Sequence, residues 1–459
     1  MKKLLCILFS FLLLKANAQQ LHTTLPSLRG LYRASYINPA FAPEYKLTVG
    51  LPVLNNLGLR FNLTGIDLHT IASNMDEGFL NMNTLYDDMD GAVGFNIPVN
   101  FDLFFIRFPI KGWYISINNS IKANQNVFNV SKEFIGFLSQ GNNYFIGKTQ
   151  NYDLFNLNLN VYNETGIGLS KEFRRLSIGA RFKVLAGIAN LQTERIRMNL
   201  NTSSVIPFPV TLTMSGNIRT GGLPLVIAQD SVDGKPVTDD DKEFKNVVRK
   251  LPELPNRGYG FDIGIGYQFN TNFSGYLSVV DIGSSINWKS NTYNYKIDDS
   301  KVEFNGLTLD EVNNKDNARD ILIDSMASKL GKAYVTRDNY VTPIPTKYYL
   351  GLDYDFTTKD RVGFLFQGQS VGGTFYSAYT GSYMRRLGRN WQITGNYSVK
   401  TFGGNDFGAG TSSRLGPVQF FFFCDNLMTF IKPTRARNLY FSFGINLVFG
   451  RNPKVFKMY

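Results

Sequence analysis

Residues 438–450 read NLYFSFGINLVFG, and every second residue from Leu439 to Phe449 carries a large apolar side chain. The intervening positions hold Tyr440, Ser442, Gly444, Asn446 and Val448. Such alternation is typical of a β-strand with one apolar face and one polar or small face. A strand over a soluble core has two such faces, and so does a strand between lipid and a wet interior.

The same alternation recurs along the chain, at 155–162, 176–184, 259–269, 348–356 and 391–400. Most of these stretches approach the length of about 9–11 residues that a tilted strand needs to cross a bilayer. Strands of soluble sandwiches average about five or six residues. The length of the runs therefore favours strands that span a membrane.

Charged residues in these runs lie on one face only. They are Arg181, Lys183, Asp262, Asp353, Asp355 and Lys400. A Lys or Arg on a lipid-facing position near the membrane midplane costs about 2–4 kcal/mol. We therefore interpret the uncharged face as lipid-facing and the six residues as candidate polar residues of a lumen. There they line a water path, bind a polar solute, or pair with one another and fill the space.

The overall composition agrees with a membrane barrel. Mean hydropathy is only −0.14 and charged residues make up 18 %, yet the chain holds 38 Phe and 24 Tyr. Alternating strands keep the average hydropathy low, and aromatic side chains gather at the two membrane interfaces. The formal charge of +12 comes from Lys and Arg scattered along the sequence. Nucleic-acid binding needs clustered basic residues, so we predict no nucleic-acid partner.

The first residues have the layout of a secretory signal. Lys2 and Lys3 precede an apolar run from Leu4 to Leu14, and a small-x-small pattern ends at Ala18. We therefore predict a signal peptide over residues 1–18, with cleavage between Ala18 and Gln19. Cys424 is then the single cysteine of the mature chain, so an internal disulfide does not stabilise it.

Short and long connections alternate along the chain. We expect fourteen strands, at 46–64, 91–109, 111–125, 153–173, 175–190, 257–269, 273–297, 346–357, 360–371, 374–385, 390–402, 406–414, 416–424 and 438–449. Short turns then fall at one end and long loops at the other, as in outer-membrane barrels. Splitting 46–64 at Asn55-Asn56 and 91–109 at Asn100 gives sixteen strands, which is also an even number.

The long connections offer little catalytic or metal chemistry. We expect short helices at 66–74, 131–138 and 308–331, and an exposed acidic loop at 230–255 that is either solvated or a calcium site. Histidine occurs only at His22 and His69. A hydrolase pair of His69 with Ser73 is the enzyme alternative, but the scarcity of His argues against it. We predict no enzyme, metal or cofactor.

Asn38-Pro39-Ala40, just before the first strand, resembles the early segment of fatty-acid-transporter-like outer-membrane barrels. It is also similar to barrels associated with type 9 secretion and gliding. VGLPVLNNLGL (49–59) and VQFFFFCDNL (418–427) resemble an uncharacterised barrel family most closely. The resemblance implies a barrel with an N-terminal segment inside it, and passage of hydrophobic compounds through its wall. It carries over no ligand-binding residue.

The sequence thus predicts an all-β, antiparallel transmembrane barrel in the outer membrane of a Gram-negative bacterium. Its parts are a signal peptide (1–18), an N-terminal periplasmic or plug segment (19–45), the barrel (46–450) and a C-terminal tail (451–459). The expected function is a porin-like passive channel or transporter for small or hydrophobic solutes. The alternatives are an accessory component of an envelope secretion or gliding machine, with protein partners, and a secreted soluble β-protein that binds glycans or proteins.

Overall fold

The computed structural model describes residues 22–452, except 53, 74, 77–78, 81–85, 90–92, 131, 133–134, 137–145, 154–155, 207, 223–254, 305–333, 372–373, 402–403 and 432–436. The predicted signal peptide with its cleavage site, the acidic loop at 230–254 and most of the C-terminal tail lie outside the described residues. So do five of the eight residues of the predicted helix at 131–138, of which 132, 135 and 136 are described and helical, and the whole of that at 308–331.

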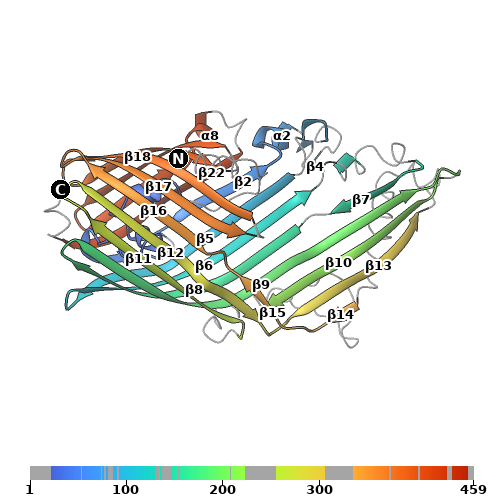
Figure 1. Cartoon of the computed structure of the whole chain (residues 1–459), viewed down its shortest axis with the longest axis horizontal. Coiled ribbons are helices and arrows are strands. Elements are labelled where there is room, and N and C mark those ends of the chain that lie inside the picture. The colour runs from blue at the N-terminus through green and yellow to red at the C-terminus, as the bar shows by residue number, and fades with distance from the viewer. Residues whose placement is uncertain are drawn as a thin grey trace, which may run out of the picture.

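The described chain is built almost entirely from strands (Figure 1). They are β1 (Tyr45–Gly50), β2 (Leu57–Thr64), β3 (Met75–Asp76), β4 (Phe79–Leu80), β5 (Val93–Ile110), β6 (Trp113–Val130), β7 (Thr149–Asp153), β8 (Asn156–Phe173), β9 (Leu176–Thr202), β10 (Val210–Gly222), β11 (Arg257–Gln268), β12 (Phe273–Trp288), β13 (Tyr293–Phe304), β14 (Tyr334–Thr336), β15 (Tyr340–Pro343), β16 (Lys347–Asp355), β17 (Asp360–Val371), β18 (Thr374–Leu387), β19 (Trp391–Lys400), β20 (Asn405–Leu415), β21 (Val418–Cys424) and β22 (Asn438–Arg451). The helical elements are η2 (Leu25–Ser27), η3 (Tyr32–Tyr36), α2 (Leu68–Ser73) and α8 (Met428–Ile431).

The strands close into an antiparallel barrel. Neighbours pair in the order β1/β2, β5, β6, β8, β9, β11, β12, β15/β16, β17, β18, β19, β20, β21 and β22. β22 then pairs back with β1 and β2, which closes the ring. The fold class and the count of fourteen are confirmed. The chain does break near Asn55-Asn56, but β1 and β2 share one position in the barrel, between β22 and β5. The alternative count of sixteen strands is therefore wrong.

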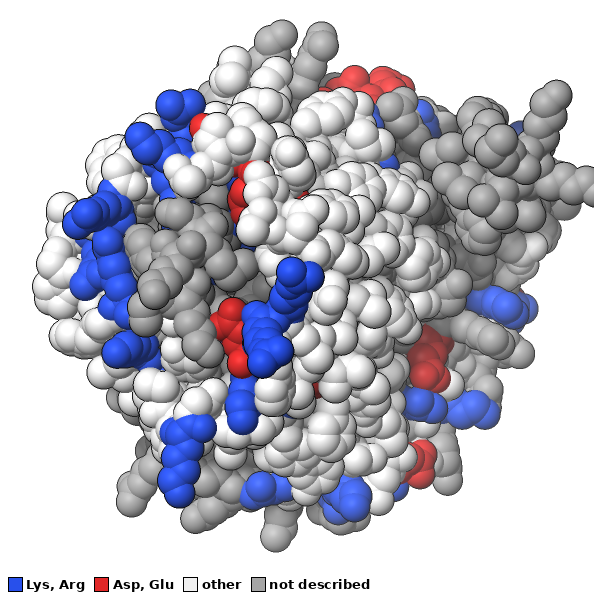
Figure 2. All heavy atoms as spheres, turned by 60° about the vertical axis from the view of Figure 1, so that its left-hand side comes forward, with Lys and Arg blue, Asp and Glu red and all other residues white. Residues whose placement is uncertain are grey.

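The outer face of the wall is apolar. Along β11, Tyr259, Phe261, Ile263, Ile265 and Tyr267 are all exposed, and the residues between them face the interior. Figure 2 shows basic side chains gathered at the short-turn end, beside a broad band of the wall with few charged side chains. An exposed apolar band is unfavourable in water and favourable against lipid.

Two predicted boundaries are wrong at the long-loop end. The stretch 273–297 is two strands, because β12 ends at Trp288 and a turn with Asn291 in the left-handed region leads into β13. Asn adopts that conformation more readily than most residues. The strand predicted at 175–190 continues to Thr202 as β9, and β10 lies in what was expected to be a loop. The outer half of β9 forms a sheet with β7, β10, β13 and β14 that extends beyond the barrel (Figure 1).

Among the described residues, no helix is long and apolar enough to cross a membrane.

Residues 22–44, which we call the N-terminal segment, lie inside the barrel near its short-turn end. Its apolar side chains are almost completely buried and form one cluster with inward-facing residues from several strands. The cluster comprises Leu25, Leu28, Leu31, Ala34, Ile37, Phe41, Tyr276, Val280, Tyr349, Leu365, Phe421 and Phe423. Near its short-turn end, the barrel interior is therefore filled with packed side chains.

Candidate functional site

The Asn38-Pro39-Ala40 motif holds the N-terminal segment against β9 and β11. Asn38 folds back on the chain, since its Oδ1 accepts a hydrogen bond from Ala40 N at 2.8 Å. Its Nδ2 donates to the carbonyls of Ile265 and Leu277 at 3.3 and 3.4 Å. Two wall glycines permit this close approach. A Cβ on Gly179 would lie 2.3 Å from the Pro39 carbonyl carbon, and one on Gly264 would lie 2.0 Å from Asn38 Oδ1.

The barrel wall is interrupted between β1/β2 and β5. β1 pairs with β5 over Thr48–Gly50 and Phe105–Arg107, and β2 pairs with it over Asn62–Thr64 and Gly94–Asn96. Between these short ladders, residues 97–104 of β5 have no strand partner on this side in the described part of the chain. We call this interruption, between 51–61 and 97–104, the seam.

The seam begins where the chain turns inward after β1. Pro52, Leu54 and Asn55 lie in a turn, and Asn55 N donates to Leu51 O at 2.9 Å. A Cβ on the inward-facing Gly444 would meet Asn55 O at 2.4 Å, so Asn55 lies against the inner face of β22. Both side-chain amide atoms of Asn55 are buried and lack a hydrogen-bond partner among the described residues. Such buried unpaired groups are costly unless water or a ligand satisfies them.

Side chains bridge the seam where backbone hydrogen bonds do not. Asn56 Nδ2 donates to Asn100 O at 3.1 Å. Arg33 of the N-terminal segment donates from Nη1 to Asn56 Oδ1 at 2.6 Å, and Ser442 of β22 donates to the same oxygen at 2.7 Å. These contacts join the segment, β22 and β5 at one point.

A β-bulge in β5 places a carboxylate on the inner side of the seam. The register with β6 shifts between Asp102 and Phe104, which turns Asp102 inward and leaves Phe104 exposed. The completely buried Asp102 accepts hydrogen bonds from Tyr32 at 2.8 Å and Ser120 at 2.7 Å. Arg33 Nε lies 3.7 Å from it. Burial, with the Asp102 charge, raises the pKa of Tyr32 well above its usual value, so the phenol keeps the proton it donates.

The two sides of the seam differ in polarity. Its inner side carries Arg33, Asn56 and Asp102, which are all buried. Its outer side carries large exposed apolar residues, namely Leu54, Ile97, Phe101 and Phe104. Phe105, next to the seam, is buried and packs against the Tyr32 ring with a centroid distance of 4.3 Å.

Three of the six candidate lumen residues come together. Arg181 Nε donates to Asp262 Oδ2 at 2.6 Å, and Lys183 Nζ lies 2.6 Å from Asp262 Oδ1. Lys183 also pairs with Asp281, which in turn accepts from Lys347 at 2.9 Å. Lys122 and Glu164 form another buried pair nearby at 2.7 Å. The inner charges therefore form a neutralising network, and we call it the ion-pair layer.

The other three candidates lie apart from this layer. Asp353 pairs with Arg29 of the N-terminal segment, and Lys400 pairs with Asp406. Asp355 receives two hydrogen bonds from Arg361, at 2.6 and 2.9 Å. All six residues are thus paired, which supports their interpretation as charges that fill the lumen. Their role in binding or transport stays a prediction.

On the loop side of the ion-pair layer the interior becomes apolar again. Along β9, the inward Arg181 and Lys183 are followed by Leu185, which is fully buried. Leu185 belongs to an apolar cluster with Tyr162, Ile286, Trp288, Tyr340 and Ile344. We call it the outer apolar cluster.

The structure adds little support for a hydrolase with His69 and Ser73 as its catalytic pair. His69 Nδ1 lies 3.2 Å from Ser73 Oγ, but both side chains are on an exposed surface helix. The described residues contain no group of three or more His, Cys, Asp or Glu side chains that could hold a metal ion.

Sequence reasoning missed the seam contacts of Tyr32, Arg33 and Asp102. Asp102 lies in the run NFDLFF, where it is the single charged residue among apolar ones. This single charge was the available signal, because a β-bulge can turn such a residue toward the interior.

Several solved structures are similar to this chain over most of its length. A toluene transporter, TbuX of Ralstonia pickettii, has 10 % identity and a TM-score of 0.40, with 92 % of this chain and 95 % of that chain covered. A FadL homologue of Pseudomonas aeruginosa has 10 % identity and a TM-score of 0.45, covering 94 % and 100 %. No curated protein matches this chain significantly. The model of the family described as "Family of unknown function (DUF5723)" matches residues 39–425, and the chain belongs to this family.

Proposed function

We propose that this protein is an outer-membrane barrel that lets small hydrophobic solutes cross, and that they leave the barrel sideways through the seam. The N-terminal segment acts as a plug that closes the periplasmic end. The short-turn end faces the periplasm and the long loops face outward, as in bacterial barrels generally.

A straight path through the barrel is unfavourable for an apolar solute. Beyond the outer apolar cluster the solute meets the ion-pair layer, whose charges require polar surroundings. Below that layer, Leu28, Leu31 and Ile37 of the N-terminal segment are at most 2 % exposed, so the interior is filled. A sideways exit shortens this path, and it requires the seam contacts of Arg33 and Asp102 to open.

The interrupted ladder at the seam is the observation that carries the proposal. Backbone groups inside a bilayer must be paired, and a closed barrel does this with continuous ladders. Here the ladder between β1/β2 and β5 stops, and exposed apolar side chains such as Phe101 and Phe104 border the interruption on the outer side. An apolar solute at this point passes directly from the barrel interior into lipid.

The outer apolar cluster has a chemistry that matches an apolar solute, and its packed side chains have to separate to admit one. Trp288 is fully buried there, and its ring lies 6.3 Å from that of Tyr340 in a stacked arrangement. Aromatic side chains offer large apolar contact areas. We therefore expect small aromatic or aliphatic compounds to be preferred over sugars and ions.

Proteoliposomes test the proposal. The purified chain should accelerate the entry of a small apolar aromatic probe over protein-free vesicles, and leave the entry of a sugar of similar size nearly unchanged. A variant with charged outer borders, Phe101→Lys with Phe104→Lys, tests the exit path and should slow the apolar probe. Equal acceleration of both solutes would show an open pore and contradict the proposal.

A second candidate function, an accessory role in an envelope machine, is favoured by the sheet beyond the barrel. That sheet has an apolar cluster of its own, with Tyr152, Met198, Leu200 and Ile297 buried in it. Solute passage alone does not require such an extension. Stoichiometric co-purification of an envelope protein would support this role, and a chain that purifies alone with full solute flux would count against it.

A further inference from the structure

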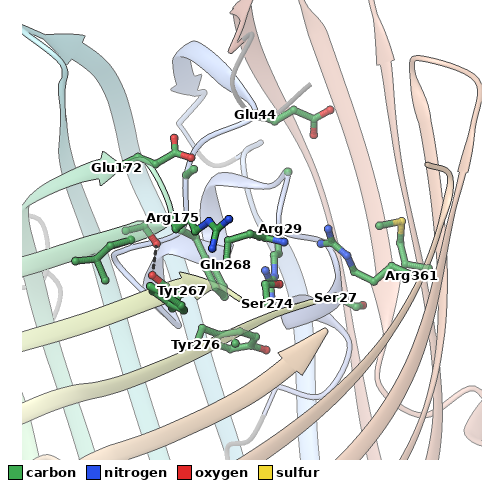
Figure 3. Close-up of a pocket in the computed structure, with 18 of the residues that line it drawn as sticks. Ser27, Arg29, Glu44, Glu172, Arg175, Tyr267, Gln268, Ser274, Tyr276 and Arg361 are labelled. Carbon is green, nitrogen blue, oxygen red and sulfur yellow. Dashed lines mark hydrogen bonds between the residues drawn. The ribbon is translucent and has the colours of Figure 1, made fainter. Parts of the chain in front are cut away.

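A cavity of about 120 Å³ lies at the short-turn end, between the N-terminal segment and the barrel wall (Figure 3). The segment contributes Ser27, Arg29 and Glu44 to its lining. The wall contributes residues at or beside three short turns, at 172–177, 266–276 and 384–392. The cavity is therefore separate from the seam and from the outer apolar cluster.

Basic side chains dominate the lining. Five arginines and two glutamates line the cavity: Arg29, Arg174, Arg175, Arg361, Arg386, Glu44 and Glu172. Figure 3 shows Arg175 and Arg361 directed toward Arg29 from opposite sides. The Arg29 guanidinium carbon lies 4.7 Å from the Phe41 ring centre and 4.5 Å from that of Tyr276, so its position is fixed by aromatic packing.

Four acidic groups, Glu44, Glu172, Asp353 and Asp355, lie beside the five arginines, so the formal charge of this group is +1. Asp353 and Asp355 pair with Arg29 and Arg361. Arg175 donates from Nη1 to Phe269 O at 3.5 Å, which is a long hydrogen bond. Burial raises the pKa of Glu44, which weakens its ability to balance the arginines. The Ser27 and Ser177 hydroxyls in the lining already donate to Thr24 O and Gly266 O. The amide groups of Gln268 and Gln392 donate one hydrogen each, to Asn270 O and Glu44, and keep a second hydrogen. Ser274 adds another hydroxyl.

We propose that this cavity binds a phosphate group, which bridges Arg29 of the N-terminal segment and Arg175 of the wall. The planar guanidinium group presents paired donors that match phosphate oxygens. Hydroxyl and amide donors from Ser274 and Gln268 complete the shell. The phosphate is either a free anion or the headgroup of a phospholipid in the periplasmic leaflet, since both present the same oxygens.

Phosphorus NMR titration of the full mature chain in a phosphate-free detergent tests the site. Inorganic phosphate and lysophosphatidic acid are the two probes. We expect saturable binding to one site, weakened about tenfold or more by Arg175→Gln. Arg389→Gln is the matched control, because Arg389 lies in an exposed turn at the same end and is not part of the lining. It should change the affinity less than about twofold, as a surface charge does.

Each outcome has a definite meaning. Binding of inorganic phosphate that displaces the lipid supports a free anion as the ligand, and binding of lysophosphatidic acid alone supports a headgroup. Absence of saturable binding of either probe overturns the site. An equal loss in Arg389→Gln, or displacement by acetate at the same concentration, overturns specific phosphate recognition. Folding of each variant is checked by heat-modifiable gel mobility, and Arg386→Gln replaces Arg175→Gln if the latter does not fold.

Discussion

The seam and the wall formed by β17 and β18 show two ways of building the same barrel. In the wall, pairing runs without a register shift from Asp360 with Arg385 to Val371 with Thr374. At the seam, two short ladders leave residues 97–104 of β5 without a strand partner among the described residues. The wall is held by its own backbone, and the seam by side chains and the N-terminal segment.

The proposed sideways exit depends on this difference. Backbone pairing satisfies the polar groups of the β17–β18 wall locally, without hydrogen bonds from the N-terminal segment. At the seam, Asn56 and Asp102 receive hydrogen bonds from Arg33 and Tyr32 of the N-terminal segment. Loss of the segment should therefore weaken the seam and leave the wall intact.

The largest effect should come from detaching the motif that anchors the segment. In Gly179→Val, the new side chain collides with the Pro39 backbone, because a Cβ there lies 2.3 Å from its carbonyl carbon. We expect hydrogen-exchange protection of residues 22–44 to fall about a hundredfold, equivalent to about 2.7 kcal/mol, with faster apolar flux. Gly395→Val is the control, since a Cβ at Gly395 has nothing within 4 Å. Unchanged protection in Gly179→Val would show that the motif does not anchor the segment.

A smaller effect should follow from removing the charge at the seam. Asp102→Asn keeps the size of the side chain but leaves Arg33 without the carboxylate 3.7 Å away. We expect the segment to lose about 1–3 kcal/mol of stability, seen as faster exchange of the Tyr32 and Arg33 amides. Asp355→Asn, which breaks an ion pair in the continuous wall, should leave those two amides unchanged. Equal effects of the two substitutions would remove the distinction between seam and wall.

The smallest effect concerns pH. Burial raises the pKa of Glu44, although Gln392 and the charges of Arg386, Arg451 and Arg414 act in the opposite direction. The packed segment therefore binds more protons than the open one between the ordinary carboxyl pKa of 4.5 and the raised value. Its stability should fall as pH rises through this window. Hydrogen exchange corrected for intrinsic rates should show a change of about threefold, lost in Glu44→Gln. A segment that becomes more stable as pH rises would contradict this.

The barrel could be predicted from the sequence, because each strand places apolar side chains on one face and polar or small ones on the other. The same alternation therefore recurs along the chain. The six candidate lumen residues alternate with the outward apolar residues, as the strand period of two requires. Each of them forms an ion pair in the structure. The resemblance to an uncharacterised barrel family, based on residues 49–59 and 418–427, is confirmed by the family match.

The seam could not be derived, because it depends on contacts between distant parts of the chain. Asn55-Asn56 was recognised as a break, but whether it adds a strand or interrupts the wall depends on the neighbours of β2. The contacts of Arg33 with Asn56 and Ser442 join residues up to 409 positions apart. The extended sheet was missed for a similar reason, since β10 is stabilised by pairing with β9 and β13 rather than by its own pattern.

Cross-linking the two sides of the seam tests the proposed sideways exit most directly. In a Cys424→Ser background, Asn56→Cys with Asn100→Cys places thiols at neighbouring positions, since Asn56 Nδ2 contacts Asn100 O at 3.1 Å. Gln367→Cys with Ala378→Cys is the matched pair across the continuous wall, since these two buried residues are paired between β17 and β18. A short reversible bifunctional thiol reagent should abolish apolar flux in the seam pair, restore it on reduction, and leave the wall pair unaffected. Full flux through a barrel with a completely cross-linked seam would contradict the sideways exit.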